Sequence, residues 1–295
     1  MYKEKPNSAP FVFFGSYGGS VIVLNELKNA GFIPALVVTP PDSPQGRHLV
    51  VTPPETKVWA EENNIPVYQP ETLRGEAVYE KLNSVGAVYF VVAAYGKIIP
   101  ANILTLPHYG VVNIHPSLLP KHRGPTPIES ALLAGDDITG VSIMLLDEEV
   151  DHGNILAQET ESIPQTENFT SIELAKRLWE LGSHLLIQTI PGWLSGDIKS
   201  KEQDHSQATF TKKLVKSDGE INLTDNAHEI FNKYRAYFSW PGIYFFTERN
   251  GKKIRVIIKH LIYKNGQIEI TRVIPEGGKE MTYQDFLRGQ HPQKS

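Results

Sequence analysis

Apolar, β-branched segments alternate with helical segments through the first two thirds of the chain, and this alternation constrains the fold more than any other feature. Segments typical of buried strands stand at 11–16, 32–39, 87–94, 110–115 and 139–147. Segments with the spacing of amphipathic helices stand at 21–30, 55–64, 74–84, 127–134 and 170–191. Strands separated by helices form βαβ units. We therefore expect an open α/β domain with a mostly parallel sheet.

Several of these helices carry start signals. Ser20 is expected to cap the first helix. Thr126 and Glu129 have the spacing of a capping box, with a proline at the first helical position between them. Thr170 and Glu173 repeat that spacing before the long helix.

The pattern changes after a polar stretch at 195–207 that has the composition of a linker. Beyond it, one short helix near 226–237 stands among strand-like segments, at 242–248, 252–263 and 267–274. The pairs Asn250-Gly251 and Asn265-Gly266 predict hairpin turns of the primed type. We therefore expect an α/β domain over 1–194, with a disordered tail at 1–10, then a linker at 195–207. A small β-barrel would occupy 208–295.

Composition excludes several function classes. The chain has no cysteine, so it has no disulfide, no thiolate catalyst and no cysteine metal ligand. The N-terminus lacks the apolar core of a secretion signal, and the longest apolar run, at 87–95, is far shorter than the ~20 residues of a membrane helix. We expect a soluble cytoplasmic protein without membrane attachment.

Charge is divided unevenly along the chain. The net charge at pH 7 is −4, yet residues 205–295 carry 15 lysines and arginines against 9 acidic residues, a charge of +6. A basic module favours a polyanionic partner such as a nucleic acid. A merely well-solvated surface would have the same count.

Asn113 and His115 stand two residues apart at the end of the strand-like segment 110–115. Alternate residues of a strand project to the same face, so both side chains would leave its carboxyl end together. Open α/β sheets bind ligands at that end, although this spacing also suits polar groups that bond to nearby backbone. Asp151 follows the next strand-like segment. If the two strands are neighbours, the three side chains converge at one sheet edge.

Such a trio suits acyl transfer without a covalent enzyme intermediate. An amide N–H and a protonated imidazole can donate to a developing oxyanion, and a carboxylate can hold the imidazolium and assist proton transfer. The competing interpretation is a metal site, because His122 and His152 are also at hand. Their spacing matches no familiar zinc pattern, and we expect no metal.

The glycine-rich turn "GSYGGS" at 15–20 follows the first strand-like segment. A strand-to-helix turn of this kind can cradle a phosphate. The sequence matches neither the dinucleotide-binding nor the P-loop pattern. A tight turn against the sheet is the simpler interpretation.

Three motifs resemble those of the folate-dependent formyltransferases: "VVAAYGKIIP", "VNIHPSLLPKHRGPTPI" and "EEVDHGNIL". Within that family the similarity is greatest to the branch that formylates an aminoacylated tRNA. "PPDSPQGR", which ends at Arg47, resembles the tRNA-contacting loop of that branch, and "YRAYFSWPGIYF" and "KEMTYQDFLRG" resemble its C-terminal barrel. The resemblance extends from residue 11 to about residue 289.

The resemblance implies a role for particular residues. Asn113, His115 and Asp151 match the catalytic trio. The folate would be bound by the loop Ser117, Leu118, Leu119 and Pro120 and by the turn Tyr95-Gly96. Arg47 matches an arginine at the tRNA acceptor stem, although His48-Leu49-Val50 follow it where the family commonly has lysines. We expect the lysines of the basic module to contact tRNA phosphates, namely Lys212, Lys213 and Lys216.

The resemblance also implies the architecture and the substrates. A Rossmann-like catalytic domain would be joined to an OB-like barrel that holds the tRNA. The formyl donor would be 10-formyltetrahydrofolate, the acceptor would be methionyl-initiator-tRNA, and the protein would be a monomer. Two alternatives stay open. One is a formyltransferase for an amino-sugar nucleotide or glycinamide ribonucleotide, and the other is a non-catalytic RNA-binding protein.

Overall fold

The computed structural model describes residues 6–45, 49–166, 169–249 and 251–289, and its chain forms two compact units. The first unit comprises Met1–Gly124, Gly140–Glu161 and Lys176–Phe210. The second comprises Pro125–Thr139, Ser162–Ala175 and Thr211–Ser295. The second unit thus takes in two short segments from within 1–194, whereas the stretch 195–207 belongs to the first unit. The division at 194 and 207 stays a prediction.

A seven-stranded sheet forms the centre of the first unit, with the strand order β5–β2–β1–β6–β7–β8–β9. Its strands are β1 (Phe11–Gly15), β2 (Leu36–Val38), β5 (Val67–Tyr68), β6 (Tyr89–Ala93), β7 (Val111–His115), β8 (Ile138–Leu145) and β9 (Ile155–Ser162). The five strands from β5 to β7 in this order run parallel, and β8 is antiparallel to β7. The predicted mostly parallel, Rossmann-like sheet is confirmed.

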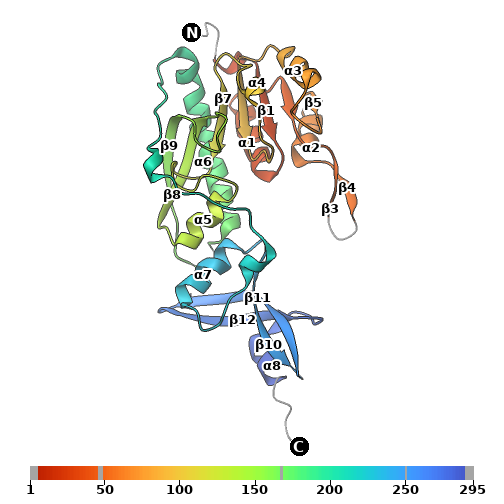
Figure 1. The fold of residues 1–295 in the computed structure, drawn as a ribbon, viewed down its shortest axis with the longest axis vertical. Helices are drawn as coiled ribbons and strands as arrows, with labels where there is room; N and C mark the ends of the chain where they lie inside the picture. Colours follow the sequence, from red (N-terminus) through yellow and green to blue (C-terminus); the bar gives the residue numbers. More distant parts are fainter. Residues whose placement is uncertain (1–5, 46–48, 167–168, 250, 290–295) are drawn as a thin grey trace, which may run out of the picture. The chain divides into compact units, whose positions relative to one another are not determined.

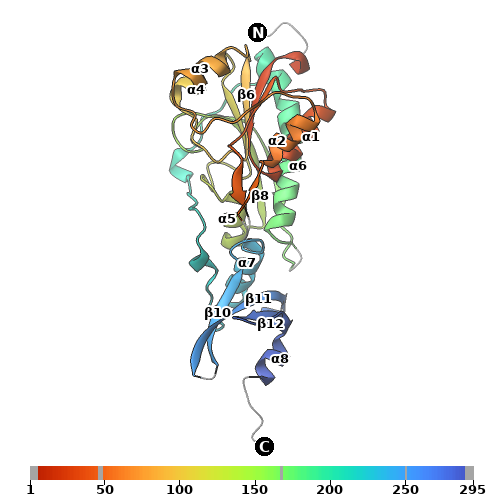
Figure 2. The ribbon, with the colours of Figure 1, turned by 90° about the vertical axis from the view of Figure 1, so that its right-hand side faces the viewer.

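Helices cover both faces of this sheet (Figures 1 and 2). Figure 2, which views the sheet from its side, shows α1 (Gly18–Asn29), α2 (Glu55–Glu62) and the long α6 (Ser171–Ser195) on one face. The helices α3 (Glu76–Asn83) and α4 (Ala101–Leu104) lie on the other face. Because both faces are covered, β1, β6 and β7 are buried along their whole length.

The strand β7 is held tightly by α6. A Cβ added at Gly182 of α6 would lie 2.7 Å from Ile114 Cγ2 and 3.0 Å from Val141 Cγ1. Glycine therefore permits an approach between helix and sheet that no other residue allows without displacing the strand. Ile114 stands between Asn113 and His115, so this contact fixes the strand end that carries the two predicted polar groups.

Several helix ends differ from the prediction. Ser20 lies inside α1, whose N-cap is Tyr17, and its hydroxyl donates to the Ala93 carbonyl at 2.7 Å. The hydroxyl thus links the glycine-rich turn to β6 instead of capping the helix. The helix α6 continues through Pro191 to Ser195, because proline removes one hydrogen bond without stopping a helix that is packed on its neighbours.

The N-terminus of α5 (Pro127–Ala134) also differs in detail. The helix begins with the expected proline and ends at Gly135, which has a φ of 70°. The predicted capping box is wrong, since Thr126 makes no side-chain cap. Its hydroxyl instead donates to the Lys212 carbonyl at 3.0 Å. At α6, by contrast, the Thr170 N–H donates to the Glu173 carboxylate at 3.1 Å, which is half of the predicted box.

The second unit contains a four-stranded antiparallel sheet in the order β10–β11–β12–β13 (Figure 1). Its elements are α7 (Ala227–Ala236), β10 (Ile243–Arg249), β11 (Lys252–Lys264), β12 (Gln267–Pro275), β13 (Met281–Thr282) and α8 (Tyr283–Arg288). Helix α7 packs on α5, β11 and β12. Asn265 and Gly266 have φ values of 52° and 76°, as a primed hairpin turn requires, so this turn is confirmed. Asn250 lies outside the described residues.

Two further observations concern the chain ends and the membrane. Of the predicted tail, Pro6–Ser8 form a short 3-10 helix, and residues 1–5 lie outside the described part. Across the described ranges, no helix combines the length and the apolar content needed to span a bilayer.

Candidate active site

Asn113 and His115 are buried at the carboxyl end of β7. Asn113 is 8% exposed and His115 is 4% exposed, so both are shielded from bulk water. The two residues are separated by Ile114 and share one face of the strand. The structure therefore places an amide and an imidazole side by side, as the spacing predicted.

Asp151 reaches His115 by a different route from the predicted one. The strands β7 and β8 are neighbours but antiparallel. His115 pairs with Ser142 in the middle of β8, and Val112 pairs with Leu145 at the end of β8. The carboxyl end of β8 therefore lies beside the beginning of β7. The loop after β8 folds back so that Asp151 Oδ1 lies 3.5 Å from His115 Nδ1. The three predicted side chains do meet, because of this loop and not because of a shared strand direction.

Both ring nitrogens of His115 face hydrogen-bond acceptors. Nε2 lies 3.0 Å from the carbonyl oxygen of His122, and Nδ1 faces the carboxylate of Asp151. A carbonyl oxygen only accepts, so Nε2 carries a proton and donates it to His122. An imidazolium could donate to both partners at once. The other oxygen of Asp151, Oδ2, accepts the Gly124 N–H at 2.7 Å.

The backbone of Asp151 is held by Gln203. Asp151 has a φ of 50°, a conformation that few residues other than glycine, asparagine and aspartate adopt readily. Gln203 Nε2 donates to the Asp151 carbonyl at 2.9 Å and to the Gly153 carbonyl at 2.7 Å. Gly153 must be a glycine, because an added Cβ would collide with the Leu145 carbonyl oxygen. One buried side chain therefore fixes the carbonyls at both ends of the turn that presents Asp151.

Arg123 in turn holds Gln203. The Arg123 Nε and Nη2 atoms donate to Gln203 Oε1 at 3.2 and 2.7 Å, and Nη2 also donates to His205 Nδ1 at 2.8 Å. Arg123 is 3% exposed and Gln203 is 5% exposed. The His205 ring is stacked on the ring of His152, with 4.1 Å between centroids. We call Arg123, Gln203 and His205 the Asp151 support.

The sequence did not single out the Asp151 support. Arg123 stands in a basic, proline-rich loop, and Gln203 stands in a polar stretch that has linker composition. Nothing in the local pattern of either segment indicates burial. The nearest signal was the histidine-glycine turn at 152–153, which indicates an unusual backbone but not the side chain that holds it.

The loop predicted to bind folate is buried and internally bonded. Ser117 is fully buried and donates to the Lys121 carbonyl at 2.6 Å, while Leu119 is 3% exposed. The Leu119 N–H donates to Ser142 Oγ at 3.0 Å, and Ser142 donates to the Ser117 carbonyl at 2.7 Å. Leu118 and Pro120 are half-buried. The loop is thus a preformed wall beside His115, and its role in folate binding stays a prediction.

Tyr95 and Gly96 lie on the same sheet edge as His115. They follow β6, which pairs with β7 through Ala93 and Ile114. The Tyr95 hydroxyl is buried without a hydrogen-bond partner among the described residues, and burial raises the pKa of Tyr95 to about 12. The hydroxyl therefore stays protonated through the neutral pH range, and the Tyr95 ring packs edge-on against Phe14 of β1 with 5.5 Å between centroids. Gly96 is exposed, with open space where a Cβ would lie.

The residues predicted to contact tRNA are only partly described. Lys212, Lys213 and Lys216 are all exposed in the second unit, and Lys212 Nζ lies 3.0 Å from Asp218 Oδ1. The pKa of Asp218 is lowered first by the hydrogen bond from the Val215 N–H and then by the bond from Lys212. Arg47 lies outside the described residues, between β3 (Ser43–Gln45) and β4 (Val50–Thr52), which form an antiparallel hairpin.

Metal ligands are not grouped in the described part of the chain. No set of three histidine, aspartate or glutamate side chains is gathered there as a metal ion would require. His152 Nδ1 lies 2.7 Å from Asp147 Oδ2, which leaves this histidine in a local pair at the surface.

Comparison with known families identifies the family of this chain. Residues 11–190 match the family profile described as formyl transferase, and residues 213–267 match the profile of the formyl transferase C-terminal domain. The chain belongs to the formyl transferase family. Asn113, His115, Asp151 and the proposed folate loop all lie within the first matched range.

Formyl transferases of bacteria resemble this chain over most of its length. It is 45% identical over 246 residues to a methionyl-tRNA formyltransferase of Chloroflexus aurantiacus, covering 83% of this chain and 78% of the relative. It is 37% identical over 307 residues to a methionyl-tRNA formyltransferase of Halalkalibacterium halodurans, covering 96% of each.

Solved formyl transferase structures share the fold. Methionyl-tRNA formyltransferase from Clostridium thermocellum superposes with a TM-score of 0.57 at 16% identity, covering 92% of this chain and 99% of that one. A sugar N-formyltransferase from Shewanella superposes with a TM-score of 0.64 at 17% identity, covering 86% and 98%. At such identities the likeness shows the fold alone.

Proposed function

We propose that this formyl transferase moves the formyl group of 10-formyltetrahydrofolate to the α-amine of methionyl-initiator-tRNA. The product would be N-formylmethionyl-tRNA for the start of translation in the cytoplasm. The observation that carries the proposal is the meeting of Asn113, His115 and Asp151 at one buried sheet edge. The acceptor is inferred from the relatives named methionyl-tRNA formyltransferase, which match most of the chain.

The chemical step needs an oxyanion site and a route for one proton. The neutral methionyl amine attacks the formyl carbon, and negative charge develops on the formyl oxygen. The Asn113 amide N–H and the His115 Nε2–H donate to that oxygen. Because Nε2 donates to the His122 carbonyl at 3.0 Å in the free protein, the formyl oxygen must compete with that carbonyl for the same hydrogen.

Asp151 completes the step by holding charge and moving a proton. Its carboxylate faces His115 Nδ1 and stabilises the imidazolium while the oxyanion exists. As the bond between the formyl carbon and N10 of the folate breaks, the proton lost by the amine passes to N10, and Asp151 assists that transfer. One carbon–nitrogen bond forms and one breaks, so the step needs no redox partner.

The Asp151 support acts through Asp151 and does not touch the substrate. Gln203 is a positioning residue, because its two hydrogen bonds hold the backbone on either side of the catalytic carboxylate. Arg123 positions Gln203 through a forked pair of hydrogen bonds. A displacement of about 1 Å at a reacting group can cost about 100-fold in rate, so the precision of this turn matters for catalysis.

The folate and the tRNA would be bound by different surfaces. The preformed loop from Ser117 to Pro120 and the Tyr95-Gly96 turn flank the catalytic edge and would hold the folate. Lys212, Lys213 and Lys216 offer exposed cations for tRNA phosphates, and Arg47 would reach the acceptor stem. We expect a monomer to be sufficient, since all three catalytic side chains come from one chain.

A single competition experiment tests the proposal. The purified protein is offered radiolabelled 10-formyltetrahydrofolate together with methionyl-initiator-tRNA, a nucleotide-linked amino sugar or glycinamide ribonucleotide. We expect label in the tRNA fraction only. Label in either small amine would assign a different acceptor, and label in none would indicate a non-catalytic RNA-binding protein.

A further inference from the structure

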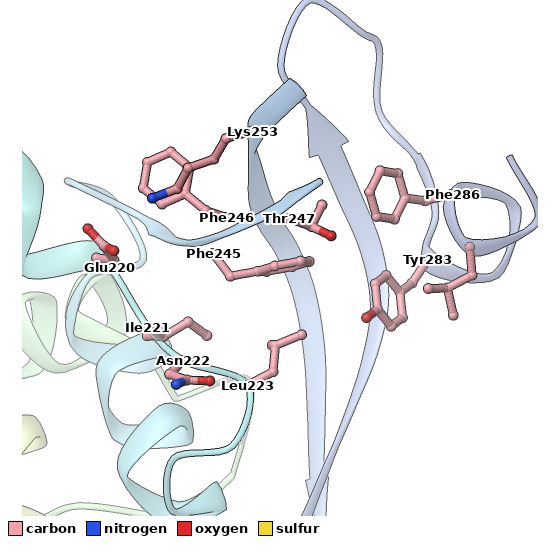
Figure 3. A pocket seen from close by; sticks show the side chains of 11 residues that line it. Glu220, Ile221, Asn222, Leu223, Phe245, Phe246, Thr247, Lys253, Tyr283 and Phe286 are labelled. Carbon is pink, nitrogen blue, oxygen red and sulfur yellow. The ribbon is translucent and has the colours of Figure 1, made fainter. Parts of the chain in front are cut away.

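A hollow of about 370 Å³ lies in the second unit, between the β10–β11 hairpin, the segment 220–223 and α8 (Figure 3). Aromatic rings form much of its wall. Phe245 is 5% exposed, Tyr283 meets it edge-on with 6.4 Å between centroids, and Phe286 lies behind Tyr283. The volume is within the range of about 300–1,000 Å³ that small-molecule sites occupy. We call this hollow the aromatic pocket.

Part of the rim of the aromatic pocket is apolar although it faces water. Leu223, Phe246 and Leu287 are 38%, 39% and 40% exposed, and all three line the same hollow. Scattered apolar side chains on a surface need no explanation, but apolar residues gathered around one concave site indicate a binding function. The site is therefore suited to a flat, partly apolar ligand.

Two cationic side chains lie over aromatic rings of this hairpin. Lys253 Nζ lies 4.4 Å from the centroid of the Phe246 ring, and Figure 3 shows its side chain running along that ring. The Arg255 guanidinium lies 5.4 Å from the centroid of Tyr244 in the same way. Residues 243–264 hold six lysines and arginines but one acidic residue. The lining of the pocket itself holds one acid, Glu220, and one cation, Lys253, so the surplus of positive charge belongs to the hairpin around it. This surplus favours a ligand that joins an anion to a ring.

We propose that the aromatic pocket binds one unpaired nucleobase of the RNA substrate. The base would enter the hollow and lie against the exposed Phe246 ring, and Lys253 at the rim would meet the adjoining phosphate. This inference rests on the proposed function, which supplies the RNA. A nucleotide joins a flat ring to an anion, and aromatic side chains beside cations are the common means of binding unpaired bases.

The polar groups of the pocket suit the edge of a base. Tyr283, Asn222 and Thr247 line the pocket together with the aromatic residues. Burial raises the pKa of Tyr283, so its hydroxyl remains a donor throughout the working range of pH. Few donors and acceptors are present, which predicts a site that accepts a base with little preference for its identity.

The substitution Phe246→Leu tests the proposal, because leucine keeps the apolar rim but removes the ring. Binding of initiator tRNA is measured by fluorescence anisotropy, and formylation kinetics are measured by varying each substrate while the other is saturating. We expect the Kd and the KM for tRNA to rise about 5- to 150-fold, the range for loss of one stacked base. The kcat and the KM for folate should stay unchanged. Phe238→Leu, an equally exposed ring outside the pocket, should have no effect.

A second measurement separates base binding from phosphate binding. Short single-stranded RNA is compared with the same strand in which the bases are replaced by abasic sites. We expect the wild-type protein to prefer the intact strand and Phe246→Leu to lose that preference. Equal binding of both strands by the wild type, or an unchanged tRNA Kd for Phe246→Leu, would overturn the pocket assignment. Failure of the wild type to formylate methionyl-tRNA would instead refute the proposed function.

Discussion

The catalytic edge and the aromatic pocket are built on opposite plans. At the catalytic edge, polar side chains are buried and tied to the backbone, as His115 is to His122 and Asp151 is to Gly124. In the aromatic pocket, the rim ring of Phe246 is exposed and the Lys253 cation lies over it. Burial fixes the direction of the catalytic side chains but restricts access of solvent to them. The exposed rim of the aromatic pocket is open to a ligand but holds the ligand's orientation less strictly.

This difference indicates how the two regions contribute to the proposed reaction. An oxyanion donor is effective only when its direction is fixed before the charge develops. A stacked base or a screened phosphate tolerates variation of position. Substitutions at the catalytic edge should therefore change kcat, whereas substitutions on the second unit should change the KM and Kd for tRNA.

The largest effect is expected at Asn113. Replacement by alanine removes one donor to the formyl oxygen, and such a loss typically lowers kcat about 100- to 1,000-fold. The Tm should change little, because the strand is held by its neighbours. Steady-state kinetics and thermal melting measure the two quantities. Asn102→Ala, at an exposed position of α4, is the matched control and should behave as wild type. Full turnover by Asn113→Ala would remove Asn113 from the proposed mechanism.

A smaller loss of kcat is expected on substitution of Gln203, because this residue acts through Asp151. Gln203→Leu should lower kcat about 10- to 100-fold by loosening the turn that holds Asp151. The exposed Gln207 of the same segment gives the control Gln207→Leu, which should leave kcat unchanged.

The link between Gln203 and Asp151 is tested by a double-mutant cycle. Asp151→Asn removes the charge but keeps a residue that tolerates the positive φ. In that background, Gln203→Leu should cause little further loss if it acts through Asp151. Two losses that simply multiply would show that Gln203 affects the enzyme in another way.

The third effect concerns stability, at the contact of α6 with β7. Gly182→Ala would press a methyl group against Ile114 and Val141, and such overpacking costs about 1–3 kcal/mol. The better helix propensity of alanine offsets about 1 kcal/mol of this. The net cost of about 0–2 kcal/mol should lower the Tm by up to about 8 °C in calorimetry. At Gly18, the nearest atom to an added Cβ is the flexible tip of Glu55, so Gly18→Ala should not lower the Tm.

The smallest effects are expected at the exposed lysines. Replacing Lys212, Lys213 or Lys216 by glutamine should weaken tRNA binding a few-fold at low salt. Each replacement should also reduce the slope of log Kd against log salt concentration by about one, because one fewer counterion is released. Lys81→Gln, on α3, should leave the slope unchanged. A slope that none of the three replacements alters would place the tRNA on another surface.

Local sequence signals predicted the elements of the fold well but not the direction of every strand. The β-branched segments and the Asn265-Gly266 turn depend on neighbouring residues, so they could be read directly. The antiparallel direction of β8 depends on how a long connection returns to the sheet, which no local pattern encodes. The same holds for Thr126, whose hydroxyl bonds to Lys212, a residue far along the chain.

The candidate site was predictable where its residues stand next to strands. Asn113 and His115 could be placed because strand geometry fixes their common face. Gln203 could not, because its burial results from contacts with residues 123, 151 and 153 that are remote in sequence. Sequence alone therefore predicts the reacting groups better than the groups that orient them.

The position of Gln203 in the chain limits how this enzyme can be divided. The formyl transferase profile ends at residue 190, and a fragment that ended there would keep Asn113, His115 and Asp151. It would lose Gln203 and His205, and also Thr209, whose carbonyl accepts the Arg123 N–H at 2.9 Å. The fragment would therefore contain all three predicted catalytic side chains. It would lack the Gln203 hydrogen bonds that hold the turn around Asp151. A chimaera of two formyl transferases that is meant to retain activity should therefore be joined after Phe210, where the last segment of the first unit ends.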